Sequence, residues 1–140
     1  MKRLLLLMAT LLMPLFFGGC SPQGREASEV RGSEPATPYV YAAKAVGQGQ
    51  PVMFEFGKGS CKACKEMGEL IFRLKKSRPH YRLFYIDVSR DRKAAAENGI
   101  RMIPTQLFFD GEGREVYRHV GGFTTDGFMQ TLQKYGFDAK

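Results

Sequence analysis

Residues 52–64 read VMFEFGKGSCKAC and combine a strand, a loop and the start of a helix. The first five are apolar except for Glu55, as in a strand buried within a sheet. A flexible loop at 57–60 follows, and then Cys61 and Cys64 with two residues between them. Cysteines at this spacing lie within bonding reach across one helical turn. The helix N-terminus also stabilises a thiolate at Cys61, the form that attacks disulfides.

Alternating helices and strands surround this stretch. Pro79 ends the helix that begins at Cys61, and the turn DGEG at 110–113 joins two strands as a hairpin. The expected elements are a helix at 38–47 capped by Thr37, strands at 52–56 and 81–88, helices at 61–77 and 91–98, strands at 105–109 and 115–120, and a last helix capped by Thr124 or Thr125. This order predicts one α/β domain with a central mixed sheet flanked by helices on both faces.

The start of the chain has the pattern of an export signal. Lys2 and Arg3 precede an apolar run that ends at Phe17, which is shorter than the roughly 18–20 residues a membrane-spanning helix needs. We therefore expect a signal peptide at 1–19, with an uncleaved single-span anchor as the alternative. Export would place the domain outside the cytoplasm, where cysteine pairs can be oxidised.

The third cysteine, Cys20, closes the sequence FGGC, which resembles the cleavage box of bacterial lipoproteins. In that box the cysteine becomes the lipidated first residue of the mature protein. Ordinary cleavage nearby is the alternative, and it would leave a reactive thiol in an oxidising compartment. Residues 20–36 are rich in Ser, Pro, Gly and Glu and predict a flexible linker between the anchor and a domain at 37–140.

The composition argues against several other classes of protein. The formal charge is +7, and it is +5 once Lys2 and Arg3 are removed, with acidic residues interleaved and no basic arm carrying aromatic residues. Nucleic-acid binding is therefore not expected. A zinc site needs four ligands, and beyond the cysteines only the isolated His80 and His119 are available. Haem attachment needs a histidine directly after Cys64, where this chain has Lys65. We therefore expect neither a metal nor a cofactor.

Taken together, the Cys-x-x-Cys at a helix start and the sequence IPT at 103–105 before the hairpin resemble the thioredoxin family over about residues 37–137. The sequences KACKE at 62–66, PT at 104–105 with LFFDG at 107–111, and GGF at 121–123 are most similar to one branch. That branch is the periplasmic carboxy-terminal domain of the thiol:disulfide interchange protein DsbD. The resemblance implies a thioredoxin fold, disulfide exchange with protein thiols, and a transmembrane electron donor of the DsbD type.

The resemblance also implies roles for individual residues. By position, Cys61 would be the exposed nucleophile and Cys64 the buried resolving thiol. Pro104 would be a cis-proline facing the pair, and Ile103 would offer backbone hydrogen bonds to a partner segment. Gly121 would keep the partner groove open.

Glu55 would correspond to the buried acid beneath the disulfide, where it could accept the proton of Cys64. The alternative is a solvated acid at a strand end. Burial would raise the pKa of this carboxyl, because desolvation disfavours its charged form. The family's lysine partner for this acid is missing, since Leu83 stands at its position, and no tryptophan precedes Cys61.

The expected protein is thus a monomeric, extracytoplasmic, lipid-anchored oxidoreductase that reduces disulfides of partner proteins. Two alternatives stay open. One is an oxidant that forms disulfides, since the reduction potential depends on more than the cysteine spacing. The other is a non-catalytic module that binds extended peptides, with Cys61 and Cys64 as a permanent staple.

Overall fold

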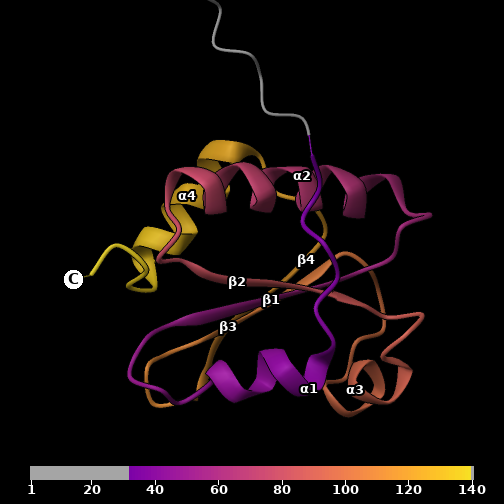
Figure 1. The fold of residues 1–140 in the computed structure, drawn as a ribbon, viewed down its shortest axis with the longest axis horizontal. Helices are drawn as coiled ribbons and strands as arrows, with labels where there is room; N and C mark the ends of the chain where they lie inside the picture. Colours follow the sequence, from indigo (N-terminus) through magenta and orange to yellow (C-terminus); the bar gives the residue numbers. More distant parts are fainter. Residues whose placement is uncertain (1–31, 140) are drawn as a thin grey trace, which may run out of the picture.

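A mixed four-stranded sheet between two layers of helices forms the core of the computed structural model, which describes residues 32–139 (Figure 1). The elements are α1 (Tyr39–Ala42), η1 (Ala43–Ala45), β1 (Val52–Gly57), α2 (Lys62–Ser77), β2 (Arg82–Asp87), α3 (Arg92–Glu97), β3 (Thr105–Phe109), β4 (Glu115–Val120) and α4 (Thr125–Lys134). The strand order is β2-β1-β3-β4. Strand β1 is parallel to β2 and antiparallel to β3, which is antiparallel to β4. The predicted order of elements and the mixed sheet are confirmed.

Alternation along the strands builds a separate apolar cluster on each face of the sheet. On the first face, Met53, Leu83 and Phe108 pack against α2 and α4. On the second face, Val52, Phe54, Phe56, Ile86 and Leu107 pack against Ala42 of α1 and Ala95 of α3. Figure 1 shows α2 and α4 on one side of the strands and α1 and α3 on the other. Both faces of β1 are therefore buried, which explains its nearly continuous apolar sequence.

Local sequence signals account for most helix boundaries. Cys61 caps α2, and the chain leaves that helix just before Pro79. Thr124 is the cap of α4, because its hydroxyl oxygen accepts a hydrogen bond from the backbone N–H of Gly127 at 3.1 Å. After α3, Gly99 adopts a φ of +64°, the left-handed conformation that ends a helix.

The first helix differs from its prediction. It is four residues long, continues as a short 3-10 turn and begins after Pro38, so Thr37 is not its cap. The reason is that the backbone N–H of Thr37 donates to the carbonyl of Tyr85 in β2 at 2.8 Å. Thr37 is thereby held to the edge of the sheet, and the helix starts later.

The last residues of the predicted linker lie against the domain. The backbone N–H of Glu34 donates to the carbonyl of Gly68 in α2 at 2.9 Å, and its carboxylate pairs with Lys75. A Cβ at Gly68 would lie 2.5 Å from the hydroxyl of Ser33, so this glycine lets the segment approach the helix closely. The predicted signal peptide at 1–19 and Cys20 lie outside the described residues.

None of the helices within residues 32–139 is both long enough and apolar enough to cross a membrane.

Candidate functional site

The two cysteines form a disulfide at the N-terminus of α2, with their Cα atoms 5.2 Å apart. Cys61 is the cap of the helix, and its sulfur accepts a hydrogen bond from the backbone N–H of Cys64 at 3.2 Å. Cys61 is partly exposed, whereas Cys64 is 0% exposed. An external thiol can therefore reach the Cys61 sulfur, and the free N–H groups of the helix start would stabilise a thiolate there.

Two exposed lysines lie beside this pair in α2. Lys62 forms an i,i+4 ion pair with Glu66 at 3.9 Å, and both side chains are well exposed. Lys65 follows Cys64 directly and is also exposed. Because water screens such surface charges, their effect on the Cys61 thiolate is smaller than that of the helix N-terminus.

The segment after α3 brings the predicted groove residues together. The peptide bond from Ile103 to Pro104 is cis, as predicted, and the backbone N–H of Gly121 donates to the carbonyl of Pro104 at 2.8 Å. Gly121 has a φ of +109°, a conformation that side chains strongly disfavour, so glycine is required at this position. Met102 lies two residues before Pro104 and is 66% exposed.

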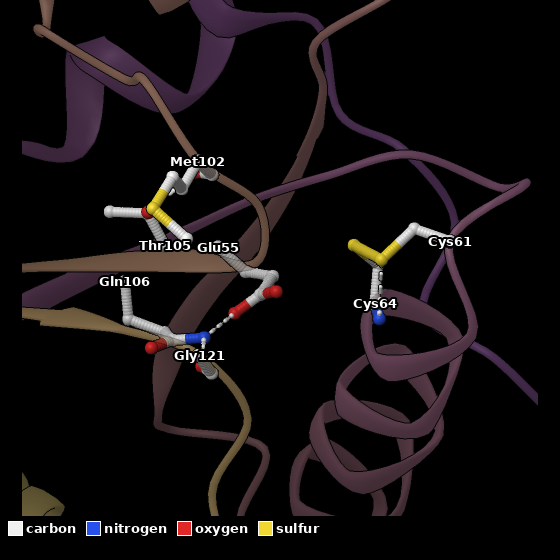
Figure 2. Close-up of a disulfide and its surroundings, with 7 residues drawn as sticks. All are labelled: Glu55, Cys61, Cys64, Met102, Thr105, Gln106 and Gly121. Carbon is white, nitrogen blue, oxygen red and sulfur yellow. Dashed lines mark hydrogen bonds between the residues drawn. A yellow bond between two sulfur atoms is a disulfide. The ribbon is translucent and has the colours of Figure 1, made fainter.

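The carboxyl group of Glu55 is near the disulfide and is 0% exposed. Figure 2 shows this carboxyl between the Gln106 amide on one side and the Cys61–Cys64 pair on the other. Burial raises the pKa of Glu55 to about 8, and the hydrogen bond from Gln106 opposes part of that rise. One carboxyl oxygen, Oε1, has no hydrogen-bond partner among residues 32–139. The predicted buried acid with a raised pKa is therefore present, and a pKa near 8 suits a proton acceptor close to neutral pH.

Sequence reasoning missed Gln106, the residue paired with Glu55 in the register of β1 and β3. Its side-chain amide donates to Oε2 of Glu55 at 2.7 Å and to the carbonyl of Gly121 at 3.0 Å. A signal was available, since Gln106 is a polar residue inside the apolar strand TQLFF. Leu83, which stands where the family has a lysine, packs in the apolar cluster under α2.

Tyr85 is a second residue that the sequence analysis overlooked. It pairs with Glu55 in the register of β1 and β2, and burial together with the nearby charges of Glu55 and Asp87 raises its pKa to about 12. A Cβ added at Gly57 would lie 2.7 Å from the Tyr85 hydroxyl and 3.0 Å from the Cβ of Cys64. The hydroxyl therefore lies at the end of β1, close to the buried cysteine.

The two histidines do not enter this arrangement of acid and cysteines. His80 is exposed, and His119 is partly exposed on β4 with its ring stacked on Phe123 at a centroid distance of 3.9 Å.

Comparisons with known proteins support the sequence resemblance. The family model of the Thioredoxin-like domain matches residues 40–136. The chloroplastic thioredoxin-like protein HCF164 of Oryza sativa subsp. japonica is 27% identical over 121 residues, which cover 84% of this chain and 42% of that protein. The thiol:disulfide interchange protein DsbD of Yersinia enterocolitica is 32% identical over 105 residues, which cover 69% of this chain and 18% of that protein. The chain thus aligns with less than half the length of either relative.

A solved structure agrees on the fold. The thioredoxin of Fasciola hepatica superposes with a TM-score of 0.58 at 24% identity, over 64% of this chain and 84% of that chain. At this identity the likeness concerns the fold alone. The thioredoxin fold and the similarity to DsbD predicted from the sequence are both confirmed.

Proposed function

Because this chain belongs to the thioredoxin-like family, we propose that it is a thiol:disulfide oxidoreductase acting on cysteines of partner proteins. One observation carries the proposal: a disulfide at a helix N-terminus joins a partly exposed cysteine to a buried one, and a buried carboxyl group lies on the side of the pair that faces Gln106. A structural staple needs neither the difference in exposure nor the buried acid.

In the reducing direction, the reaction starts from the dithiol. The Cys61 thiolate attacks a partner disulfide, one partner sulfur leaves as a thiolate, and a mixed disulfide links Cys61 to the other. Cys64 then gives its proton to Glu55, and its sulfur forms a bond to the Cys61 sulfur as the bond between Cys61 and the partner breaks. The partner leaves with two reduced sulfurs, and the chain holds the Cys61–Cys64 disulfide.

Partner binding is assigned to the backbone around the cis peptide bond. Ile103 would offer its backbone N–H and carbonyl to an extended partner segment, Pro104 would line the contact, and Gly121 would leave room for the partner. The exposed side chain of Met102 adds an apolar contact beside these residues. The protein would act as a monomer.

The resemblance to DsbD supports the reducing direction, with electrons supplied by a transmembrane donor of that type. A redox titration of the Cys61–Cys64 couple tests this direction. We expect a potential nearer the roughly −270 mV of thioredoxin than the roughly −120 mV of a strong disulfide-forming oxidant. A potential near that of the strong oxidant would indicate that the protein forms disulfides in its partners instead of reducing them.

Residues 1–20 support a location outside the cytoplasm, with lipids on Cys20 as the membrane anchor. Cys20→Ser should move the protein from the membrane fraction to the soluble fraction. Because Cys20 precedes the domain expected at 37–140, exchange by the purified protein should stay unchanged. If the wild-type protein is soluble and carries no lipid on Cys20, the proposed membrane anchor is wrong.

Mixed disulfides provide the direct test of the exchange activity. Cys64→Ser should accumulate adducts through Cys61 that a reductant releases, because attack still occurs and resolution does not. Cys61→Ser is the matched control and should accumulate none. If neither variant captures a partner while the wild type still binds an extended peptide, the chain is a binding module.

A further inference from the structure

The amide of Gln106 is the feature that the proposed reaction leaves unassigned. The side chain is 0% exposed near the start of β3, and burying an amide is costly unless it is hydrogen-bonded. Its nitrogen donates to both Oε2 of Glu55 and the carbonyl of Gly121, at 2.7 and 3.0 Å. Its oxygen has no hydrogen-bond partner in the described part of the chain. Both N–H groups of the amide therefore donate hydrogen bonds, and its oxygen accepts none from the described residues.

The Gly121 carbonyl fixes which way this amide faces. A turned amide would place its own oxygen against the Gly121 carbonyl, and two acceptors cannot form a hydrogen bond. The N–H side is therefore held toward Glu55 whatever the charge of that carboxyl. A donor in this place favours the carboxylate over the protonated acid, which opposes the effect of burial.

Among the residues that the structure describes, burial and the Gln106 hydrogen bond are what shift the pKa of Glu55, and no positive charge contributes. Tyr85 lies beside it on β2, and Cys64 lies at the start of α2. On β4, His119 is the register partner of Gln106 and stacks on Phe123. Among residues 32–139, the hydrogen bond that Glu55 accepts through its side chain comes from Gln106.

We propose that Gln106 is a positioning residue that holds Oε2 of Glu55 and leaves Oε1 free to take the proton of Cys64. The proposal rests on the exchange reaction above, in which the Cys64 sulfur bonds to Cys61 while its proton moves to Glu55. A neutral donor suits this task better than a lysine would. A positive charge would stabilise the carboxylate strongly and weaken it as a base, whereas an amide orients it and keeps it basic.

The test compares Gln106→Met with the wild type. Methionine has a similar length but no N–H group, so the pKa of Glu55 should rise by about one pH unit, a tenfold change in ionised fraction. Carboxyl-carbon NMR of the oxidised protein measures this shift without any exchange activity. In stopped-flow exchange, the pH at which the rate levels off should move upward by the same amount. That movement should vanish in the Glu55→Gln background.

Leu107→Met is the matched control, because Leu107 is equally buried in β3 but belongs to the cluster on the other face. It should leave the Glu55 titration unchanged. The inference is overturned if Gln106→Met leaves the midpoint where it is, or if the midpoint moves and the exchange profile does not. A wild type without exchange activity would instead overturn the proposed function, while the NMR titration still decides whether Gln106 tunes Glu55.

A second measurement needs only the wild type and covers the case in which Gln106→Met does not fold. The side-chain amide protons of Gln106 should exchange slowly with solvent and should shift with the same midpoint as Glu55. Fast exchange, or no response across that midpoint, would contradict the proposed contact.

Discussion

Along β1, the neighbours Phe54 and Glu55 are equally excluded from water but meet opposite surroundings on the two faces of the sheet. The ring of Phe54 has four aromatic neighbours, with the Phe109 ring centroid closest at 5.2 Å. Within the part of the chain that the structure describes, the carboxyl of Glu55 has one hydrogen-bond donor, and one of its oxygens has no partner. Burial stabilises the fold at the first position and is costly at the second.

The difference shows that one face of the sheet contributes mainly to stability, whereas the other buries polar groups at a cost in stability. On the face covered by α1 and α3, aromatic and aliphatic side chains fill the space. On the face covered by α2, apolar packing stops near the end of β1, where Tyr85, Glu55 and Gln106 form a polar row across three strands. This row lies near Cys64, the cysteine that we propose gives up its proton during exchange.

The largest expected change comes from the apolar face. Phe54→Ala removes a ring that is 1% exposed and should lower the free energy of unfolding by about 3–5 kcal/mol. Exchange per folded molecule should stay at the wild-type value, because Phe54 faces away from the disulfide. Urea unfolding and an exchange assay on the same samples measure both. A loss of exchange by the folded variant would mean that the two faces are not independent.

The second prediction concerns the pH dependence of stability. The pKa of Glu55 is about 8 in the folded protein against 4.5 ordinarily, so between these values the folded state binds more protons than the unfolded state. Wild-type stability should therefore fall as pH rises from about 5 to 8, by at most roughly 1.4 kcal/mol per pH unit from this group. Glu55→Gln lacks the titrating group, so its stability should not fall in this way. Its free energy of unfolding should therefore increase relative to that of the wild type as pH rises. Parallel curves for the two oxidised proteins from urea unfolding would show that Glu55 is ionised when folded.

A smaller effect is expected at the end of β1. Gly57→Ala would place a Cβ 2.7 Å from the Tyr85 hydroxyl, and such overpacking should cost about 1–3 kcal/mol of stability. Tyr85→Phe removes that hydroxyl, so the double variant should regain part of the loss. The recovery should be incomplete because the Cβ of Cys64 is also within 3.0 Å. Additive losses in thermal unfolding would argue that the hydroxyl does not restrict this site.

Much of the fold could be predicted from the sequence because its signals are local. The turn at 110–113, the cap at Thr124 and the break at Pro79 each depend on residues close by in the chain. The prediction that Thr37 caps the first helix was wrong, because a hydrogen bond from Thr37 to Tyr85, 48 positions away, overrides the local capping pattern. The contacts of Glu34 with α2 were missed for the same reason.

The site was predictable where a motif or a resemblance marked it, and less so where register alone makes it. The cysteine spacing identified Cys61 and Cys64, and the resemblance identified Glu55, Pro104 and Gly121 as candidates. Gln106 and Tyr85 reach the site only because the sheet pairs both of them with Glu55. Neither carries a sequence pattern that predicts this pairing, although a glutamine in an apolar strand is an unusual residue that invites attention.

The most direct test of the central claim is the pH dependence of disulfide exchange in wild type and Glu55→Gln, measured by stopped flow between about pH 6 and 9, a range that brackets the ordinary thiol pKa. If Glu55 takes the Cys64 proton, the wild-type rate should level off near pH 8 while the variant continues to rise. The variant should be slower by up to roughly 10²-fold at the acidic end, and the gap should shrink as Cys64 ionises unaided. Superimposable profiles would contradict the account and leave Glu55 with a structural role.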